Sequence, residues 1–352
     1  MHGLKGTRVC EPLMLQALAG IRTSRPPFWL MRQAGRYLPE YRAVRAKRET
    51  FLELCLDPEL AAEVTLQPVR RFGPDAAIVF SDILVIPFLL GRDVRFVDGT
   101  GPVLDAIEGV RELGPLPARM NASGIAPVYE TIARVRAALP GEVALIGFAG
   151  APWTVATYMV EGGSSRDYLR TRRWLYADPE GFSALIDVLI EATIAHLDAQ
   201  IGAGAQVVKL FDSWAGVLAP RAFERWCVAP TRRIVDELHR RHPGVPVIGF
   251  PRGAGSGYAE FVRGSGVDAV AIDTTVSPVW AARVLQPLVP VQGNLDPAAL
   301  VAGGEGMAGE VRAITRALSR GAHVFNLGHG VLPATPPDHV GELAELLRSG
   351  TV

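Results

Sequence analysis

The feature that most constrains the fold of this chain is a regular series of eight short apolar runs, most of them ending at Gly, Asp, Ser or Asn. The runs are continuously apolar, which is typical of strands covered on both faces in a parallel sheet. Amphipathic stretches with helical periodicity separate most of them, for example at 179–203 and 220–241. The predicted strands are 28–31, 76–80, 144–148, 207–211, 245–250, 269–272, 289–292 and 323–327.

Eight strands alternating with helices over 352 residues indicate an α/β protein of the (β/α)8 TIM-barrel class. The rival arrangement is a doubly wound open sheet, but no GxGxxG loop follows the first run. A small hairpin is predicted at 94–99, inserted after the second strand. Since no repeat, low-complexity tract or linker divides the chain, we expect residues 1–352 to form a single catalytic domain.

Charge and cysteine usage exclude several classes of protein. The 36 basic and 36 acidic residues balance, so no overall field draws the chain toward nucleic acid or a membrane surface. Cys10, Cys55 and Cys227 are scattered and odd in number, which argues against a disulfide framework and against a zinc site. The N-terminus lacks the apolar core of a signal peptide. We therefore expect a cytoplasmic protein without a metal.

In a barrel, functional side chains lie where the strands end, in the loops that lead to the helices. Those positions form a rim rich in arginine and aspartate, and arginine presents a planar donor fork that fits carboxylates. A polyanionic ligand is indicated, while Arg42, Arg45, Lys47 and Arg48 are expected to be solvated. The predicted rim contains Arg32, Gln33, Arg36, Ser81, Asp82, the loop 149–153, Asp212, Ser213, Arg252, Asp273, 293–294, Asp296 and 328–330.

Asp82 lies between two apolar runs, where a carboxylate is costly to bury unless it receives hydrogen bonds. It is a candidate N-cap for a following helix, a candidate ion-pair partner of Arg32 or Arg36, or an acceptor for N–H donors of a ligand. The spacing of the residues does not decide among these three interpretations.

Three further side chains have two interpretations each. Tyr158 lies on a helix predicted to begin near Pro152 and to end at Gly162, where a tyrosine is more often a packing residue than a chemical group. His329, between two glycines, is suited to orient an anionic ligand or to act as a general acid. Lys209 is predicted to point into the barrel, where it would pack or form a Schiff base.

Four motifs closely resemble the uroporphyrinogen decarboxylase family of haem biosynthesis, and the first two are long and specific. The likeness runs in matching order from about residue 10 to the C-terminus. It implies a cofactor-free (β/α)8 barrel, usually a homodimer. Its small-molecule substrate, uroporphyrinogen III, loses four acetate carboxyl groups as CO2 and becomes coproporphyrinogen III. The motifs are PFWLMRQAGRYLPEYR at 27–42, FSD at 80–82, GFAGAPWTVATYMVEGG at 147–163 and NLGHG at 326–330.

Position by position, the resemblance implies that Asp82 accepts the pyrrole N–H groups and acts in catalysis together with Arg32 and Tyr158. The proton donor stays open: an arginine is a poor acid, so a water held by Arg32, or His329, is chemically easier. The three phenylalanines among the implied contacts would form an apolar wall. The residues implied to bind substrate are Arg32, Gln33, Arg36, Phe80, Asp82, Phe148, Tyr158, Phe211, Ser213 and His329.

Three other functions fit parts of the pattern. Barrel methyltransferases use a zinc–thiolate site, but this sequence has no His-x-Cys and no cysteine at a predicted strand end. A class I aldolase would work through Lys209, which lies two to four residues short of the rim. A non-catalytic tetrapyrrole carrier would use the same arginines without releasing CO2.

Overall fold

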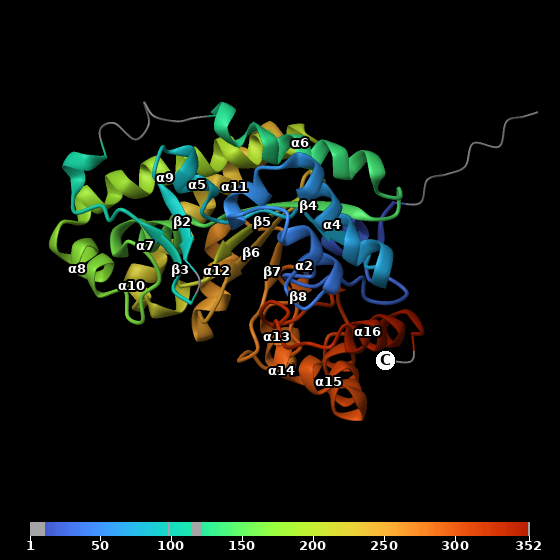
Figure 1. Ribbon diagram of the computed structural model, residues 1–352. Helices are drawn as coiled ribbons and strands as arrows, with labels where there is room; N and C mark the ends of the chain where they lie inside the picture. Colours follow the sequence, from blue (N-terminus) through green and yellow to red (C-terminus); the bar gives the residue numbers. More distant parts are fainter. Residues whose placement is uncertain (1–10, 98, 114–121, 351–352) are drawn as a thin grey trace, which may run out of the picture.

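A seven-stranded parallel sheet forms the centre of the molecule, with the helices outside it (Figure 1). The computed structural model describes residues 11–97, 99–113 and 122–350. An antiparallel ribbon, β2 (Val94–Val97) with β3 (Gly101–Leu104), stands apart from the sheet. In their order across the sheet, the strands are β1 (Ala76–Ile78), β4 (Ala144–Gly150), β5 (Val207–Asp212), β6 (Val247–Pro251), β7 (Ala269–Ala271), β8 (Val291–Gln292) and β9 (His323–Val324).

Helices alternate with these strands, and four of them begin with the same kind of dipeptide. Asp57, Asp178, Ser277 and Asp296 each accept a backbone N–H in the first turn, and a proline follows each of them. The helices are α1 (Leu13–Leu18), α2 (Pro39–Arg45), α3 (Phe51–Cys55), α4 (Pro58–Phe72), α5 (Val85–Leu89), α6 (Ala122–Ala138), α7 (Pro152–Glu161), α8 (Leu169–Ala177), α9 (Pro179–Gly202), α10 (Pro220–Phe223), α11 (Ala229–Arg241), α12 (Tyr258–Ser265), α13 (Pro278–Val284), α14 (Pro297–Ala302), α15 (Gly304–Ala317) and α16 (Pro337–Arg348).

The first predicted strand, 28–31, is wrong in its extent, although the segment closes the barrel where expected. Phe28 forms a single parallel bridge with Phe325, and its carbonyl accepts the Asp75 N–H at 2.8 Å on the other side. Side chains replace a neighbouring strand as hydrogen-bond acceptors, so no longer ladder forms. The side-chain acceptors are Asp75 for Phe28 N–H (2.8 Å), Gln33 for Leu30 N–H (3.1 Å) and Asn326 for Met31 N–H (3.0 Å).

The other seven predicted strands are confirmed in place, with ends that differ by up to three residues. The largest difference is β9, predicted at 323–327 and observed as His323–Val324, with one further bridge between Leu295 and Leu327. The predicted hairpin at 94–99 is confirmed as β2 and extends through β3, while Asp98 lies outside the described residues. None of the described helices is long and apolar enough to span a membrane.

The barrel interior is largely apolar, but it also holds a glutamine, Gln292, whose Oε1 accepts the Trp29 Nε1–H at 3.0 Å, and a lysine. Lys209 is fully buried, which confirms its predicted inward orientation. Its Nζ lies 4.9 Å from the ring centroid of Trp29, 4.8 Å from that of Phe211 and 5.0 Å from that of Phe250. Burial lowers its pKa well below the usual value, and the amine has no hydrogen-bond partner among the described residues. Three rings therefore surround this amine below the rim.

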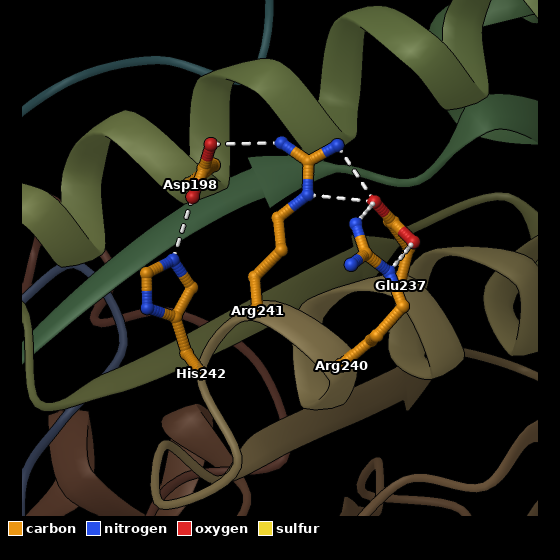
Figure 2. Close-up of polar contacts among 5 residues, drawn as sticks. All are labelled: Asp198, Glu237, Arg240, Arg241 and His242. Carbon is orange, nitrogen blue, oxygen red and sulfur yellow. Dashed lines mark hydrogen bonds and ion pairs between the residues drawn. The ribbon is translucent and has the colours of Figure 1, made fainter.

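A charged network ties α9 to α11 at the end of the barrel opposite the rim (Figure 2). Arg241 donates to Asp198 at 2.8 Å and to Glu237 at 2.7 Å, and His242 Nε2 lies 2.6 Å from Asp198 Oδ1. Arg240 also donates to Glu237, at 2.8 Å. Hydrogen bonds from the two arginines lower the pKa of Glu237 to about 2. Arg240 and Arg241 are thus neutralised by carboxylates of the chain itself.

Candidate active site

Arg32 lies in a tight turn after the first barrel segment, and this turn contacts the loop after the last segment. It has a φ of 59° and is one of two non-glycine residues with positive φ among those described. A Cβ added to Gly330 would lie 2.4 Å from Arg32 Cδ, so glycine is needed where the arginine crosses the backbone. The Val331 N–H donates to the Met31 carbonyl at 2.9 Å. These contacts fix the first and last loops to each other.

The three neighbouring polar residues of this turn have different environments. Arg32 and Arg36 are exposed, and their guanidinium groups have no ion pair or hydrogen bond with any described residue. Arg42 donates to the Arg36 carbonyl at 2.8 Å and steadies its backbone. Gln33 is only 3% exposed, and its Nε2 donates to the Ala76 carbonyl at 3.3 Å. The structure therefore places both arginines at the rim and the Gln33 side chain beneath it.

Asp82 is half-buried on the loop after β1, and the helix-cap interpretation of this residue is wrong. Its Oδ1 accepts the Leu84 N–H at 2.8 Å within the loop, whereas α5 begins at Val85 without a side-chain cap. It forms no ion pair with Arg32 or Arg36, so that interpretation is wrong as well. Burial raises the pKa of Asp82 to about 6, although the Leu84 N–H and Arg32 act to lower it. At neutral pH the carboxylate is ionised and keeps spare acceptor capacity.

Tyr158 lies on α7, which begins at Pro152 and ends at Gly162 as predicted. Its ring centroid is 6.3 Å from that of Trp214, and burial raises the pKa of its hydroxyl. Asp82 raises the same pKa and Arg32 lowers it, so all three groups lie within electrostatic reach of one another. The structure thus brings together the three side chains predicted to be catalytic.

Asp212, the last residue of β5, has a structural role. Asp212, predicted at the rim, is 2% exposed and accepts the Thr154 hydroxyl at 2.5 Å, which fixes the start of α7. Ser213 follows on a turn and is half-buried. The Trp214 N–H donates to the Thr154 Oγ1 at 3.1 Å. The turn that carries Ser213 and Trp214 is therefore anchored on both sides.

His329 is a neutral hydrogen-bond donor at the rim. Its Nδ1 accepts the Gly330 N–H at 2.6 Å, which leaves the ring proton on Nε2. Burial and the guanidinium groups of Arg252 and Arg32 lower the pKa of His329 to about 4, against Asp273, which raises it. At neutral pH the imidazole carries no charge, so it is better suited to orient a ligand than to act as a general acid.

The predicted apolar wall is divided between two clusters. Phe148 and Phe211 meet edge to face, with ring centroids 5.5 Å apart. Phe80 instead packs against Tyr41 at 5.7 Å and Phe51 at 5.6 Å. The first pair lines the third and fourth barrel strands, and the second cluster lies under the loop of Asp82.

Two further rim residues of the sequence pattern have structural roles. Asp273 is 3% exposed and accepts the Gly253 N–H at 2.7 Å, the Tyr258 hydroxyl at 2.8 Å and the Thr275 hydroxyl at 2.6 Å. These bonds join the loops after β6 and β7. Asp296 serves as the N-cap of α14. Neither carboxylate is left free for a ligand in the way that Asp82 is.

Sequence reasoning missed Trp214 and Tyr168 and gave Arg252 no role. Arg252 and the turn of Trp214 both follow strand ends, so the expectation that functional side chains follow strand ends could have found both. Tyr168 precedes α8, away from any strand end, and no spacing pattern marks it. Its ring centroid lies 5.1 Å from that of Trp214.

The described residues contain no group of three or more His, Cys, Asp and Glu placed to hold a metal ion. Cys55 and Cys227 are buried free thiols, and Cys10 lies outside the described residues. Two hollows of about 120 and 380 Å³ open near the amino-terminal ends of the strands, and none of the predicted site residues lines them.

Comparison with known proteins identifies the family. Residues 11–350 match the family model for uroporphyrinogen decarboxylase (URO-D). The uroporphyrinogen decarboxylase of Rhodospirillum rubrum is 53% identical, over 95% of this chain and 96% of its own length. That of Rhizorhabdus wittichii is 56% identical, over 95% of this chain and 97% of its own length.

Solved structures agree on the architecture. A methyltransferase from Methanosarcina mazei superposes with a TM-score of 0.77 at 19% identity, covering 96% of this chain and 97% of its own; at that identity the likeness is one of fold alone. With the family match, it confirms the predicted barrel class. From the match over nearly all of its length and the identity to curated relatives, the chain belongs to the uroporphyrinogen decarboxylase family.

Proposed function

We propose that this protein removes the four acetate carboxyl groups of uroporphyrinogen III as CO2, without a cofactor, and releases coproporphyrinogen III. The observation that carries the proposal is the environment of Asp82. An ionised, half-buried carboxylate with one loop N–H as its partner lies on the same rim as the unpaired Arg32 and Arg36. A ligand that satisfies all three must offer both N–H donors and carboxylates, and a reduced tetrapyrrole does so.

The reaction needs a place for the electrons of the broken C–C bond. Protonation of the pyrrole carbon next to the acetate makes the ring cationic, and this cation accepts the electron pair when CO2 leaves. A second proton on the exocyclic carbon then gives the methyl group, and loss of the proton first added to the ring carbon restores the neutral pyrrole. Asp82 stabilises the cationic ring by a charge that is already in place before the reaction. This is the catalytic role proposed for it.

Substrate binding falls to the side chains around Asp82. Arg32 and Arg36 bind carboxylates through their planar donor forks. Tyr158, Ser213 and His329 donate hydrogen bonds from the other loops of the rim, and Phe80, Phe148 and Phe211 contact the apolar macrocycle. Gln33 contributes chiefly by holding the turn of Arg32, since its amide is used by the Leu30 N–H and the Ala76 carbonyl.

The protons come from water held at the rim by Arg32. Two observations support water over His329 as the donor: the low pKa of His329 leaves it neutral, and its Nδ1 is occupied by the Gly330 N–H. Arg32 itself is too weak an acid. Tyr158, whose pKa is raised by burial, positions the water and does not supply the proton.

We further infer that the whole chain works as one catalytic domain in the cytoplasm, assembled as a homodimer, with no nucleic-acid or membrane partner. Balanced charge and the resemblance of the motifs support these inferences. Light scattering on the eluting protein tests the assembly, and a mass of one chain at working concentration would contradict the dimer.

The decisive experiment is anaerobic incubation of the protein with uroporphyrinogen III, followed by chromatographic counting of the remaining carboxyl groups. Stepwise loss from eight to four is the expected result. Unchanged substrate would overturn the proposal. Binding without turnover would instead favour a tetrapyrrole carrier.

A further inference from the structure

Arg252 has no role in the proposed function, although its backbone is firmly held at the rim. It follows β6, and its N–H donates to the Asp212 carbonyl at 3.1 Å while its own carbonyl accepts the Gly216 N–H at 3.0 Å. The next residue, Gly253, donates to buried Asp273 at 2.7 Å. A Cβ on Gly216 would lie 2.4 Å from the Gly253 carbonyl oxygen, so the two loops touch at this point. The backbone at Arg252 is therefore held in one place.

The guanidinium of Arg252 has no carboxylate partner. It forms no ion pair or hydrogen bond with the part of the chain that the structure describes, although it is half-buried. Asp273, which accepts the N–H of the next residue, is already satisfied by Gly253, Tyr258 and Thr275. The guanidinium carbon lies 5.9 Å from the centroid of the Trp214 ring. A partly desolvated cation without a counterion is unfavourable unless a ligand supplies one.

Backbone strain marks the same place. Among the described residues, Arg32 and Tyr168 alone combine a side chain larger than glycine's with a positive φ, 59° and 53° respectively. Such conformations are costly and gather at functional sites. The Tyr168 ring packs against that of Trp214 with centroids 5.1 Å apart, and Trp214 lies beside Arg252. One strained residue thus accompanies Arg32 and Arg36, and the other lies near Arg252.

The barrel places these two groups on opposite sides of the rim. From the segment of Phe28, which leads to Arg32, the sheet order reaches β6 after four steps through β1, β4 and β5. It also reaches β6 after four steps through β9, β8 and β7. Both Arg252 and Arg32 lower the pKa of His329, so this residue lies within electrostatic reach of each of them. A macrocycle with carboxylates around its whole edge needs cations on both sides.

We propose that Arg252 binds a non-reacting carboxylate of the substrate, in a subsite formed with Trp214 and Tyr168 opposite Arg32 and Arg36. The inference rests on the proposed function, because it takes the ligand to be an octacarboxylate. The competing interpretation is that Arg252 only packs on Trp214 by a cation–π contact. That role would contribute to stability and not to binding.

The test measures binding of uroporphyrin, the stable oxidised octacarboxylate, by fluorescence titration, so that no turnover is required. Arg252→Gln should weaken binding by about 10- to 100-fold, as expected for a charged hydrogen bond. Arg252→Lys, which keeps the charge, should recover part of the loss. Arg225→Gln is the matched control, since Arg225 is exposed and stacks on Trp226 at 4.5 Å. It should bind within about twofold of the parent protein.

Kinetics provide the second measurement. Because a non-reacting carboxylate is bound equally in the ground state and the transition state, Arg252→Gln should raise KM and leave kcat nearly unchanged. Unaltered uroporphyrin binding by Arg252→Gln would overturn the proposal. So would an Arg252→Lys variant that binds no better than Arg252→Gln. If the parent protein binds uroporphyrin but releases no CO2, the proposed function fails, while the binding comparison still decides the role of Arg252.

Discussion

Two sets of arginines, one at each end of the barrel, contrast in the partners that the chain gives them. At the lower end Arg25 is paired with Asp75 at 2.7 Å, and Arg241 lies between Asp198 and Glu237 (Figure 2). At the rim the guanidinium groups of Arg32, Arg36 and Arg252 have no such partner among the described residues. Where the chain supplies the counterion, the arginine contributes to stability. Where it does not, the cation is available for a ligand.

The largest effect is expected for Asp82→Asn, which should lower kcat by about 100- to 1,000-fold because the charge facing the ring cation is lost. Stability should not fall. The pKa of Asp82 is raised to about 6, so its ionisation opposes folding as pH rises through that value. The variant should therefore gain in Tm over the parent at pH 7, and the gain should shrink toward pH 4.5. An equal loss of Tm and activity would contradict this role.

A matched pair of substitutions tests the comparison directly. Arg36→Gln at the rim should lower kcat/KM by about 10- to 100-fold through loss of a charged hydrogen bond, with Tm unchanged. Arg25→Gln at the lower end should do the reverse. It removes two bonds of 2.7 Å to Asp75 and should lower the free energy of unfolding by about 1.5–3 kcal/mol. Urea unfolding and steady-state kinetics on both variants measure the two effects.

The comparison of the two ends is contradicted if the variants Arg36→Gln and Arg25→Gln change stability and activity in the same way. A stability loss in Arg36→Gln as large as that in Arg25→Gln would mean that the rim arginine has a partner within the fold. A kcat/KM of Arg25→Gln more than about fivefold below that of the parent would mean that the Asp75 contact reaches the site through Phe28.

A smaller effect is expected from pH. Asp82 must be ionised to act, and its pKa of about 6 implies that kcat/KM falls below that pH, by about tenfold at pH 5 relative to pH 7. His329, with a pKa of about 4, adds no step between pH 5 and 8. A pH profile of the decarboxylation of uroporphyrinogen measures this, with Tm followed in parallel as the control. A profile flat to pH 5 would remove Asp82 from the ionised role.

The smallest effect is expected in the exposed network of the lower end. Glu237→Gln removes the partner of Arg240 and Arg241, but exposed ion pairs contribute little and are screened by salt. Tm should change by no more than about 1 °C, and 1 M salt should reduce that change further. A loss of several degrees would show that the network clamps α9 to α11 more strongly than exposed charges usually do.

Most of the barrel was predictable because its strands appear in the sequence as continuous apolar runs. The exception is the first predicted strand, 28–31. Its residues are as apolar as those of any other strand, yet side chains of Asp75, Gln33 and Asn326 accept its N–H groups. Apolar patterning reports burial and does not report which atoms satisfy a buried backbone. The extent of this strand was therefore beyond the reach of the sequence.

The site was predictable only for side chains that directly follow the end of a strand. That rule placed Arg32, Asp82 and His329 on one rim, and the structure brings them within electrostatic reach. It also gave Asp212 and Asp273 the same rank, because sequence does not show that Asp212 accepts the Thr154 hydroxyl or that Asp273 accepts the Tyr258 hydroxyl. Which carboxylates are free is a property of the folded loops.

The closure of the barrel through side chains has a consequence for how such a rim can change. A backbone ladder is the same for every sequence, whereas the acceptors at Gln33 and Asn326 are each altered by one substitution. These acceptors hold the turn that carries Arg32, whereas the seven-stranded sheet does not depend on them. We expect a substitution at either acceptor to redirect the Arg32 side chain, while the sheet that positions the other rim residues stays in place.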